Sequence, residues 1–531
     1  MKTVVVFAFL FVFLGIVLIP YAGLESDEVL FTPPLYGPIN TAFAIRLFHH
    51  TVPLMVMSYI GALKTFVYWP LSWIFPVNVY FVRLPMVLVG AATVLIFYKW
   101  AAIFAGSRGA LLAAALLATD PTFLLTDTFD WGPVALQHLL VVSGCLLIAR
   151  GRLSWGTFLF GLALWNKAIF LWTLSGLTLA ALLACTAGVR VVLADRRKWS
   201  RAMLAFVLGA LPLLVYNVKH PNTTLGDNAH LSLENLPVKY AVLTSAVDGS
   251  GLLGYLVASD SQQNPREPSS LQGRAASWIS EHSGRRDKNL MPYAILLATS
   301  IVLLWWRAPG RRAALFAAVC GGVTFLAMAV TRNAGTGIHH SVLLWPMPQL
   351  LVGVAFGALP WRWLRVGMVA LLVGSNLLVV SRYMAQFERN GTVGSFTDAV
   401  FPLAESLAAS ASETIYIIDW GIFESVDFLR QGKSHLHPLL MLPTVDPAQR
   451  RDIDAMIADP HALFVDHVPS REAFAGADAR LQAIAQTEGY RKEPIHTVTD
   501  RNGRAVFQLF RLHPQGRRDR LNAMAFGPPA P

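Results

Sequence analysis

The chain has 531 residues, of which 54% are hydrophobic and only 14% charged, with a mean hydropathy of +0.49. Soluble domains carry roughly 25% charged residues, so this composition excludes a purely soluble chain. The net charge of +11 does not indicate nucleic-acid binding, because many basic residues lie in short loops between apolar runs and no basic run is interleaved with aromatic residues.

Long apolar runs predict a multi-pass α-helical membrane protein. A spanning helix needs about 20 mostly apolar residues. This window selects about eleven segments, near residues 3–20, 84–103, 109–125, 133–149, 154–170, 171–189, 202–218, 291–306, 313–330, 342–360 and 364–381. The first run could instead be a cleaved signal peptide, because Lys2 precedes it and the small residues Ala22 and Gly23 follow it. Its length exceeds the roughly 7–15 residues of a signal core, which favours a retained span.

The distribution of lysine and arginine predicts the orientation. With the N-terminus in the cytoplasm, every second loop is basic, and these loops contain Lys2; Lys99 and Arg108; Arg150 and Arg152; Arg190, Arg196, Arg197, Lys198 and Arg201; Arg307, Arg311 and Arg312; and Arg362 and Arg365. Cytoplasmic loops of membrane proteins carry this excess. An odd number of spans then predicts that the C-terminal domain lies outside the cytoplasm. The expected location is the cell inner membrane, for which this side is the periplasm.

The cysteines predict neither a disulfide framework nor a metal site. Cys145, Cys185 and Cys320 each lie inside an apolar run. No spacing of cysteine and histidine resembles a zinc site. The sequence therefore predicts no metal ligands.

Three segments outside the cytoplasm are long enough to have structure. Residues 21–82 begin with SDEVLF and continue into IRLFHHTVPLMVMSYIGALKTFVYWPL, which is rich in aromatic residues and is expected to form helices lying in the membrane interface. Residues 219–290 are polar and rich in glycine, serine and asparagine, so we expect a partly mobile loop. We expect residues 1–382 to form the membrane module and residues 383–531 a soluble domain.

The soluble domain has the pattern of a small α/β fold. TIYIIDWG and ALFVDHV predict strands, and DPAQRRDIDAMIAD and SREAFAGADARLQAIAQ predict helices. EPIHTVTDRNGRAVFQLFRL predicts a hairpin that turns at Asn502 and Gly503. The residues after Pro514 are expected to be disordered.

Two groups of acids lie on the outer side of the predicted membrane. Asp27 and Glu28 follow the first span, and they are either an ordinary polar cap or a general base for a hydroxyl acceptor. Asp120, Asp127 and Asp130 lie in ATDPTFLLTDTFDWGPV, near the end of the third expected span. They are either loop aspartates or part of a pocket shared with Asp27, because both groups return to the same face.

Basic side chains are predicted at the same outer level. They are Lys64, Arg83, Lys167, His339 and His340. Each could extend to the interface on its aliphatic stem, and this alternative is favoured for Arg83. Lys167 lies in LALWNKAIFLW with no acid nearby in the sequence, so it needs a distant partner. Cations near a lipid surface, together with acids, suit a phosphate leaving group and an activated hydroxyl.

These motifs resemble the GT-C glycosyltransferases, in the branch of the protein O-mannosyltransferases and the lipid A aminoarabinose transferase (glycosyltransferase family 39). The resemblance covers the organisation of residues 1–380 and rests on motifs in a shared order: SDE, YIGALK, VRLP, ATDPTFLLTDTFDWGPV, GLALWNKAIF and GIHHSVLLWPMPQLLVG. The resemblance implies inverting transfer of a hexosyl or pentosyl group from a polyprenyl-phosphate donor to a glycan, lipid or protein hydroxyl on the extracytoplasmic face. No cofactor is required, although a divalent cation is compatible with the chemistry.

The resemblance also implies roles for individual residues. Asp27 matches the catalytic base and Glu28 is its neighbour. Lys64, Arg83 and Lys167 match positions expected to bind the donor phosphate. His339 and His340 lie in the motif that matches the late outer loop of bacterial members, and they are expected to bind the donor phosphate as well. Asp120 and Asp130 match the acids after the third span, and with Asp127 they are expected to line the sugar or acceptor pocket.

The sequence departs from the family pattern in two ways. It has Thr126 and Asp127 where mannosyltransferases tend to carry a basic residue, and it lacks their additional soluble repeats. Protein mannosylation of the eukaryotic type is therefore not favoured. Two alternatives stay open at this point: a transporter or lipid flippase, in which the buried ionisable residues form a coupling pathway, and a non-catalytic envelope assembly protein on the same scaffold.

Overall fold

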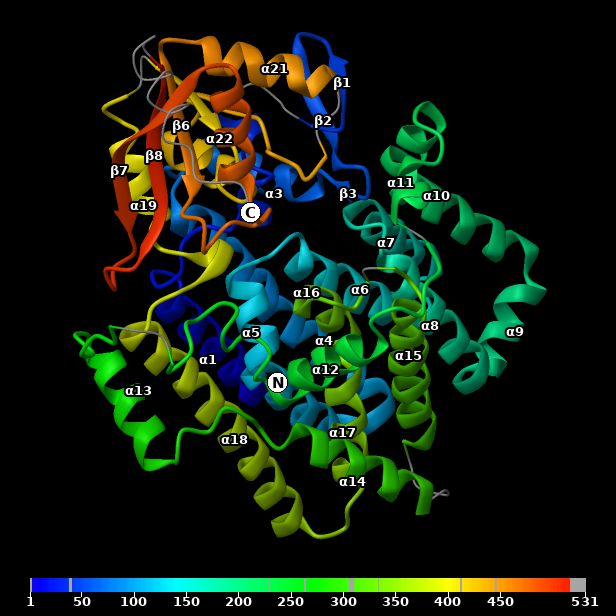
Figure 1. The fold of residues 1–531 in the computed structure, drawn as a ribbon. Coiled ribbons are helices and arrows are strands. Elements are labelled where there is room, and N and C mark those ends of the chain that lie inside the picture. Colours follow the sequence, from blue (N-terminus) through cyan, green and yellow to red (C-terminus); the bar gives the residue numbers. More distant parts are fainter. Residues whose placement is uncertain are drawn as a thin grey trace. The chain divides into compact units, whose positions relative to one another are not determined.

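The structure is a computed structural model that describes residues 2–37, 41–228, 230–261, 264–304, 310–332, 334–410, 413–444 and 447–515. The chain divides into two compact units (Figure 1). The helical unit comprises Met1–Pro20, Ile39–Ser259 and Glu267–Arg389, and the C-terminal unit comprises Tyr21–Pro38, Asp260–Arg266 and Asn390–Pro531. The tail expected to be disordered lies almost wholly in residues 516–531, outside the described residues.

The helical unit contains a helix wherever a span is expected. These helices are α1 (Lys2–Leu18), α4 (Val79–Thr119), α5 (Pro121–Thr128), α6 (Val134–Ala149), α7 (Leu153–Asn166), α8 (Phe170–Ala184), α9 (Thr186–Ala194), α10 (Arg196–Lys219), α14 (Met291–Leu304), α15 (Arg311–Ala329), α16 (Ile338–Ser341), α17 (Met347–Gly357) and α18 (Arg362–Arg389). Among the described residues, five helices are long and apolar enough to cross a membrane, or six if the bent pair α8 and α9 forms one span. The eleven-span topology therefore stays a prediction.

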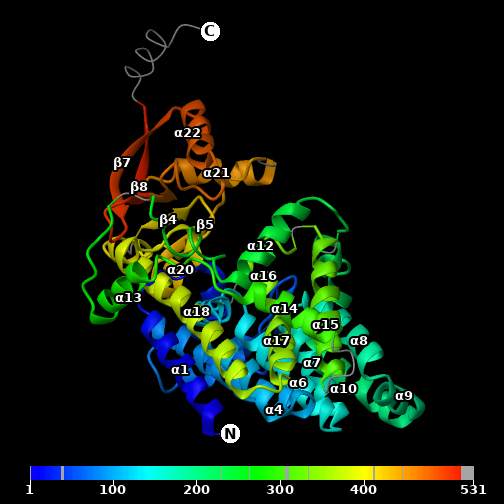
Figure 2. The ribbon, with the colours of Figure 1, turned by 90° about the horizontal axis from the view of Figure 1, so that it is seen from below.

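Glycines shape the helical unit at two kinds of position. Gly106 interrupts α4 with φ 67° and ψ 170°, a conformation in which a side chain would be strained, so two helices lie on either side of it as the hydropathy pattern predicts. Gly161 of α7 and Gly209 of α10 face each other, because a Cβ atom on either would lie within 2.3 Å of the backbone of the opposite helix. Small residues allow membrane helices this close an approach. Helix α17 likewise packs against α4, α14 and α15 (Figure 2).

The expectation of interfacial helices is wrong for the first part of residues 41–82. Residues 43–61 form an antiparallel sheet of β1 (Phe43–Leu47), β2 (His50–Met57) and β3 (Ile60–Gly61), and only α3 (Leu63–Ser72) is helical. Leu47 pairs with His50 across a two-residue turn in which Phe48 has φ 54°. The burial of β2 alternates over part of its length, which is the period of a half-exposed strand and not of a helix.

Residues 219–290 also differ from the expected mobile loop. They contain α11 (Thr223–Asn228), α12 (Leu236–Asp248) and α13 (Leu271–His282). Pro237 lies in the first turn of α12, and the Ser270 hydroxyl accepts a hydrogen bond from the Gly273 N–H at the start of α13. These are favourable ways to begin a helix, and the polar composition conceals them.

The C-terminal unit is built on a five-stranded sheet. Its order is β5 (His435–Pro438), β4 (Thr414–Ile417), β6 (Ala462–His467), β8 (Ala505–Pro514) and β7 (Tyr490–Thr499), and Figure 1 shows β6, β8 and β7 side by side. Strand β4 is parallel to β5 and β6, whereas β8 is antiparallel to β6 and β7. The predicted strands and the hairpin at Asn502 and Gly503 are present. Strand β5 is not predicted, because His435–Pro438 lacks the apolar alternation of a strand.

Helices cover both faces of this sheet. On one face, α19 (Val400–Ser406) and α20 (Phe423–Arg430) bury Leu403 and Val426 against Ile415. On the other face, α21 (Pro447–Ala458) and α22 (Ala477–Thr487) bury Ile457 and Leu481 against Phe464. Helix α21 agrees with its prediction. Helix α22 begins seven residues later than the helix predicted to start at Ser470. The sequence does not predict α19 and α20.

The segment after α1 belongs to the C-terminal unit. The Gly23 N–H donates a hydrogen bond to the Phe396 carbonyl oxygen at 2.9 Å, and a Cβ atom at Gly23 would lie 1.9 Å from the Thr397 carbonyl oxygen. The Leu24 carbonyl accepts from the Ser425 hydroxyl at 2.8 Å. The expected boundary at residues 382 and 383 therefore differs from the observed division, in which α18 continues to Arg389 and Tyr21–Pro38 leaves the membrane module.

The predicted orientation can be tested with single cysteines, because Ser470 and Ala194 are both exposed in the structure. In a chain with alanine at Cys145, Cys185 and Cys320, we expect Ser470→Cys to react with a membrane-impermeant thiol reagent in intact spheroplasts. Ala194→Cys should react only after permeabilisation, because its loop is basic. The opposite labelling pattern would overturn the orientation with the C-terminal unit outside.

Candidate functional site

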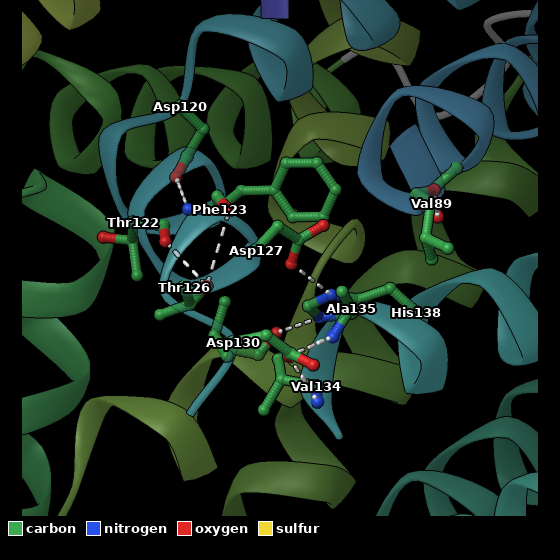
Figure 3. A network of polar contacts seen from close by, with 12 residues as sticks. Val89, Asp120, Thr122, Phe123, Thr126, Asp127, Asp130, Val134, Ala135 and His138 are labelled. Carbon is green, nitrogen blue, oxygen red and sulfur yellow. Dashed lines mark hydrogen bonds and ion pairs between the residues drawn. The ribbon is translucent and has the colours of Figure 1, made fainter. Parts of the chain in front are cut away.

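The short connection between α5 and α6 is the centre of the candidate site. It consists of residues 129–133, FDWGP, all buried, and is called the FDWGP loop below. The Asp130 Oδ1 accepts hydrogen bonds from the N–H groups of Val134 and Ala135, both at 2.9 Å (Figure 3). Asp130 thereby satisfies donors in the first turn of α6 that have no partner within the helix. Gly132 has φ 71°, which a side chain would disfavour.

Lys64 forms an ion pair with Asp130. Its Nζ lies 2.7 Å from the Asp130 Oδ2 and 3.3 Å from the Asp130 carbonyl oxygen. The two side chains are 0% and 1% exposed, and Lys64 lies in the first turn of α3. Two residues that are far apart in the sequence and both predicted as site residues are therefore in direct contact.

Lys167 approaches the same loop from the end of α7. Its backbone is extended, with φ −154° and ψ 113°, and it forms a β-bridge with Ile60 of β3. The Lys167 ammonium group lies against the loop, because a Cβ atom at Gly132 would be 3.2 Å from the Lys167 Nζ. A larger residue in place of Gly132 would crowd the ammonium group. The Lys167 side chain is buried against the loop that contains Asp130.

Arg83 contacts the first residue of the loop. Its guanidinium carbon lies 4.8 Å from the centroid of the Phe129 ring, and its Nη1 donates to the Ile19 carbonyl oxygen at 2.6 Å, just beyond the end of α1. Arg83 is fully buried within the protein. The interpretation that it extends to the membrane interface is therefore wrong, because such a side chain would expose its charged end.

His339 and His340 join the site through aromatic contacts. The His339 ring centroid lies 4.4 Å from that of Trp131 and 4.1 Å from that of His340. Tyr255 also stacks on Trp131, with the two ring centroids 4.9 Å apart. Four residues of the FDWGP loop thus each contact a different basic residue that the sequence predicts for the site. These contacts are Phe129 with Arg83, Asp130 with Lys64, Trp131 with His339 and Gly132 with Lys167.

Asp120 and Asp127 have other neighbours. The Asp120 Oδ1 accepts from the Phe123 N–H at 2.9 Å at the start of α5, and its Oδ2 accepts from the Gln349 Nε2 at 2.9 Å. Asp127 lies beside His138 (Figure 3), and its Oδ1 is 3.4 Å from the His138 Nδ1. His138 was not predicted, because a single histidine in an apolar helix gives no signal of its partner.

Asp27 and Glu28 belong to the C-terminal unit, on the short helix α2 (Ser26–Val29). Glu25 caps this helix, because its Oε2 accepts from the N–H of Asp27 at 2.7 Å and of Glu28 at 3.2 Å. Glu28 is fully buried, whereas Asp27 is half-buried. Burial and the neighbouring charge of Asp27 raise the pKa of Glu25 well above its usual value. Asp27 is thus the more accessible member of the predicted pair.

A further buried lysine has a structural explanation. The Lys239 Nζ donates to the carbonyl oxygens of Ala329 at 2.8 Å and Thr331 at 2.6 Å, at the C-terminal end of α15. Cations are favourable near helix C-termini, where carbonyl groups lack partners within the helix. Lys239 therefore stabilises a helix end, in contrast to Lys64, which pairs with an acid.

No family model matches the chain, and no curated protein matches its sequence. Its structure is similar to that of ArnT from Cupriavidus metallidurans bound to undecaprenyl phosphate, with a TM-score of 0.57 and 13% identity over 95% of this chain and 97% of that chain. The apo state of the same protein matches with a TM-score of 0.55, 14% identity and the same coverage. The oligosaccharyltransferase AglB from Archaeoglobus fulgidus, in complex with an inhibitory peptide and a dolichol-phosphate, matches with a TM-score of 0.48 and 11% identity over 98% of this chain and 74% of that chain.

The likeness to ArnT shows that the chain has the GT-C fold. The resemblance inferred from the order of the motifs is confirmed at this level. The chain is therefore a mostly helical membrane protein with a C-terminal sheet domain.

The ion pair at the centre of the site predicts a specific pattern of stability. Lys64→Met removes the cation 2.7 Å from the buried Asp130, and breaking a buried pair from one side costs about 3–5 kcal/mol. We expect a marked fall in the melting temperature of the protein in detergent. The double variant Lys64→Met/Asp130→Asn should recover much of the loss.

Lys198→Met is the matched control, because Lys198 pairs with Asp195 at 3.3 Å on an exposed surface. Such exposed pairs contribute at most about 1 kcal/mol, so its melting temperature should barely change. An equal effect of Lys64→Met and Lys198→Met would contradict the assignment of a stabilising buried pair.

Proposed function

We propose that the chain is a membrane glycosyltransferase that moves a hexosyl or pentosyl group from a polyprenyl-phosphate donor to a hydroxyl acceptor on the extracytoplasmic, periplasmic face of the inner membrane. The observation that carries the proposal is the likeness to ArnT, which covers nearly the full length of both chains and includes a structure with bound undecaprenyl phosphate. The acceptor is a glycan, lipid or protein hydroxyl.

The charges around the FDWGP loop support binding of the donor phosphate. Lys64, Arg83 and Lys167 all approach this loop, and the loop itself supplies one carboxylate, Asp130. Cations in a buried environment form short, strong hydrogen bonds to phosphate oxygens. They also stabilise negative charge that develops on a leaving group, because no solvent must reorganise. The three cations therefore suit a sugar-phosphate ester whose phosphate leaves as an anion.

Asp27 is the proposed general base. It takes the proton of the acceptor hydroxyl while the oxygen forms a bond to the anomeric carbon, and the bond from that carbon to the phosphate oxygen breaks with the electron pair going to phosphate. A single displacement of this kind inverts the anomeric centre. Partial exposure of Asp27 and the hydrogen bond that fixes its backbone to Glu25 support this role.

The proposed reaction needs no metal ion or organic cofactor at the FDWGP loop. Positioning of the two substrates and stabilisation of the phosphate charge supply the catalytic effects that the proposal requires. A divalent cation remains compatible with the phosphate chemistry.

The donor site can be tested with bare undecaprenyl phosphate as the probe. We expect Lys167→Met to weaken its binding to the purified protein by at least about tenfold, because a charge-assisted hydrogen bond contributes about 1.5–3 kcal/mol. Lys198→Met, which removes an exposed lysine, should bind like the wild-type protein. Equal binding by the Lys167→Met protein, with an unchanged melting temperature, would exclude Lys167 from the phosphate site.

The general base can be tested by Asp27→Asn, which keeps the shape of the side chain and removes its basicity. We expect sugar transfer to fall by at least about 10²-fold, the lower end for a lost general base, with little change in undecaprenyl phosphate binding. Cells that carry this variant should accumulate the same sugar-phosphate lipid as cells without the protein, detected by mass spectrometry of lipid extracts.

Glu28→Gln should have a milder effect, because Glu28 is fully buried. A severe effect of Glu28→Gln alone would move the base to Glu28. Full activity of both variants would remove α2 from the chemistry. If deletion of the protein leaves the sugar-phosphate lipids unchanged and abolishes movement of a lipid across the membrane, the protein is a flippase. If neither process changes, it is a non-catalytic assembly protein.

A further inference from the structure

The C-terminal unit contains a second cluster of ionisable residues, at the carboxyl ends of two inner strands of its sheet. Asp419 follows β4 by two residues, and Asp466 and His467 are the last two residues of β6. Strands β4 and β6 are adjacent and parallel. The chain passes from β4 to β5 on one side and then to β6 on the other side. In open α/β sheets, ligands bind beyond the carboxyl ends of the strands at such a reversal of strand order.

The three side chains are close enough to share one ion. One ligand atom from each of Asp419, Asp466 and His467 lies within 4.8 Å of the other two, and all three residues are buried. Metal–ligand bonds in proteins are about 2.0–2.6 Å long, so one ion placed among these atoms can contact all three after small side-chain adjustments. Asp419 and Asp466 offer oxygen and His467 offers imidazole nitrogen.

Hydrogen bonds hold Asp419 in place. Its Oδ2 accepts from the His467 Nδ1 and from the Ala473 N–H, both at 2.7 Å, and its Oδ1 accepts from the Phe474 N–H at 3.0 Å. The contact with His467 also orients the imidazole ring.

Asp466 provides an independent indication of a ligand. It is fully buried, and neither carboxylate oxygen has a hydrogen-bond partner within the described part of the chain. A buried carboxylate without a partner is strongly unfavourable. Burial, followed by the charges of the neighbouring acids Asp419, Glu472 and Asp478, raises the pKa of Asp466 to about 8. Lys492, the basic residue paired with Asp478 at 2.7 Å, is already bonded there and to Gln508.

A bound cation explains the cluster of these three residues better than a purely structural role does. A structural pair of Asp419 and His467 accounts for those two residues but leaves Asp466 without a partner. A cation contacts both carboxylates and offsets their charges. Two carboxylate oxygens with one imidazole nitrogen suit Zn²⁺ or Mn²⁺, whereas Ca²⁺ and Mg²⁺ prefer oxygen ligands alone. Three protein ligands leave at least one position of a tetrahedral Zn²⁺ ion for water or another ligand.

We propose that Asp419, Asp466 and His467 form a binding site for a divalent transition-metal ion, Zn²⁺ in the first instance, at the carboxyl ends of β4 and β6. This site is separate from the predicted donor-phosphate residues, all of which belong to the helical unit. It does not depend on the proposed transferase reaction, so either proposal can fail without the other.

The test uses the full-length protein in detergent after removal of metals with EDTA. We expect ZnCl₂ alone, up to about 100 μM, to raise the melting temperature of the wild-type protein, because a ligand that binds only the folded state stabilises it. Elemental analysis after desalting should find about one zinc ion per chain. CaCl₂ at the same concentration should have little effect.

Two variants separate this site from other zinc-binding groups. Asp466→Asn should abolish the zinc-dependent rise, while the metal-free variant should be at least as stable as the metal-free wild type, because the amide cannot take on the charge that burial disfavours. His467→Gln should also abolish the rise. Asp452→Asn on the exposed surface of α21 is the matched control and should respond to zinc like the wild type. The proposal is overturned if the wild type shows no rise, or if Asp466→Asn and His467→Gln keep it, which would assign zinc binding to surface histidines.

Discussion

The ion pair between Lys64 and Asp130 is the contact on which the candidate site depends. Burying either charge alone costs several kcal/mol, so each side chain needs the other. The pair joins α3 to the loop between α5 and α6, and it fixes that loop where Arg83, Lys167 and His339 also reach it. These four basic residues come from four separate parts of the chain, and the five-residue FDWGP loop is their shared contact.

The two units carry different chemistry. In the helical unit, the FDWGP loop meets more basic side chains than it supplies acids, which favours an anionic ligand. In the C-terminal unit, Glu25, Asp27 and Glu28 lie on or next to α2, and Asp419 and Asp466 lie at the carboxyl ends of two inner strands of the sheet. Acids in such numbers favour proton transfer or cation binding. This difference underlies both the proposed transferase reaction and the proposed zinc site.

The segment of residues 43–57 shows where reasoning from the sequence fails. Its aromatic and apolar residues suggest amphipathic helices, whereas the structure forms β1 and β2. Composition does not distinguish the two, because a short apolar run suits either period. The turn at Phe48 and the pairing of Leu47 with His50 decide for the strands. In contrast, the sequence predicts α21 and the hairpin of β7 and β8 correctly, because their local patterns and turn residues are sufficient.

The sequence by itself determined the membrane class, the positions of the long apolar helices, most of the C-terminal strands and the residue types of the candidate site. These properties depend on hydropathy, turn chemistry and motif order, which are local features of the chain. Only the tertiary structure decided that Lys64 pairs with Asp130, that Trp131 contacts His339, that Asp27 and Glu28 belong to the C-terminal unit, and that Asp466 lies beside Asp419. Contacts between residues so far apart depend on how whole helices and strands pack, and no local pattern encodes that packing.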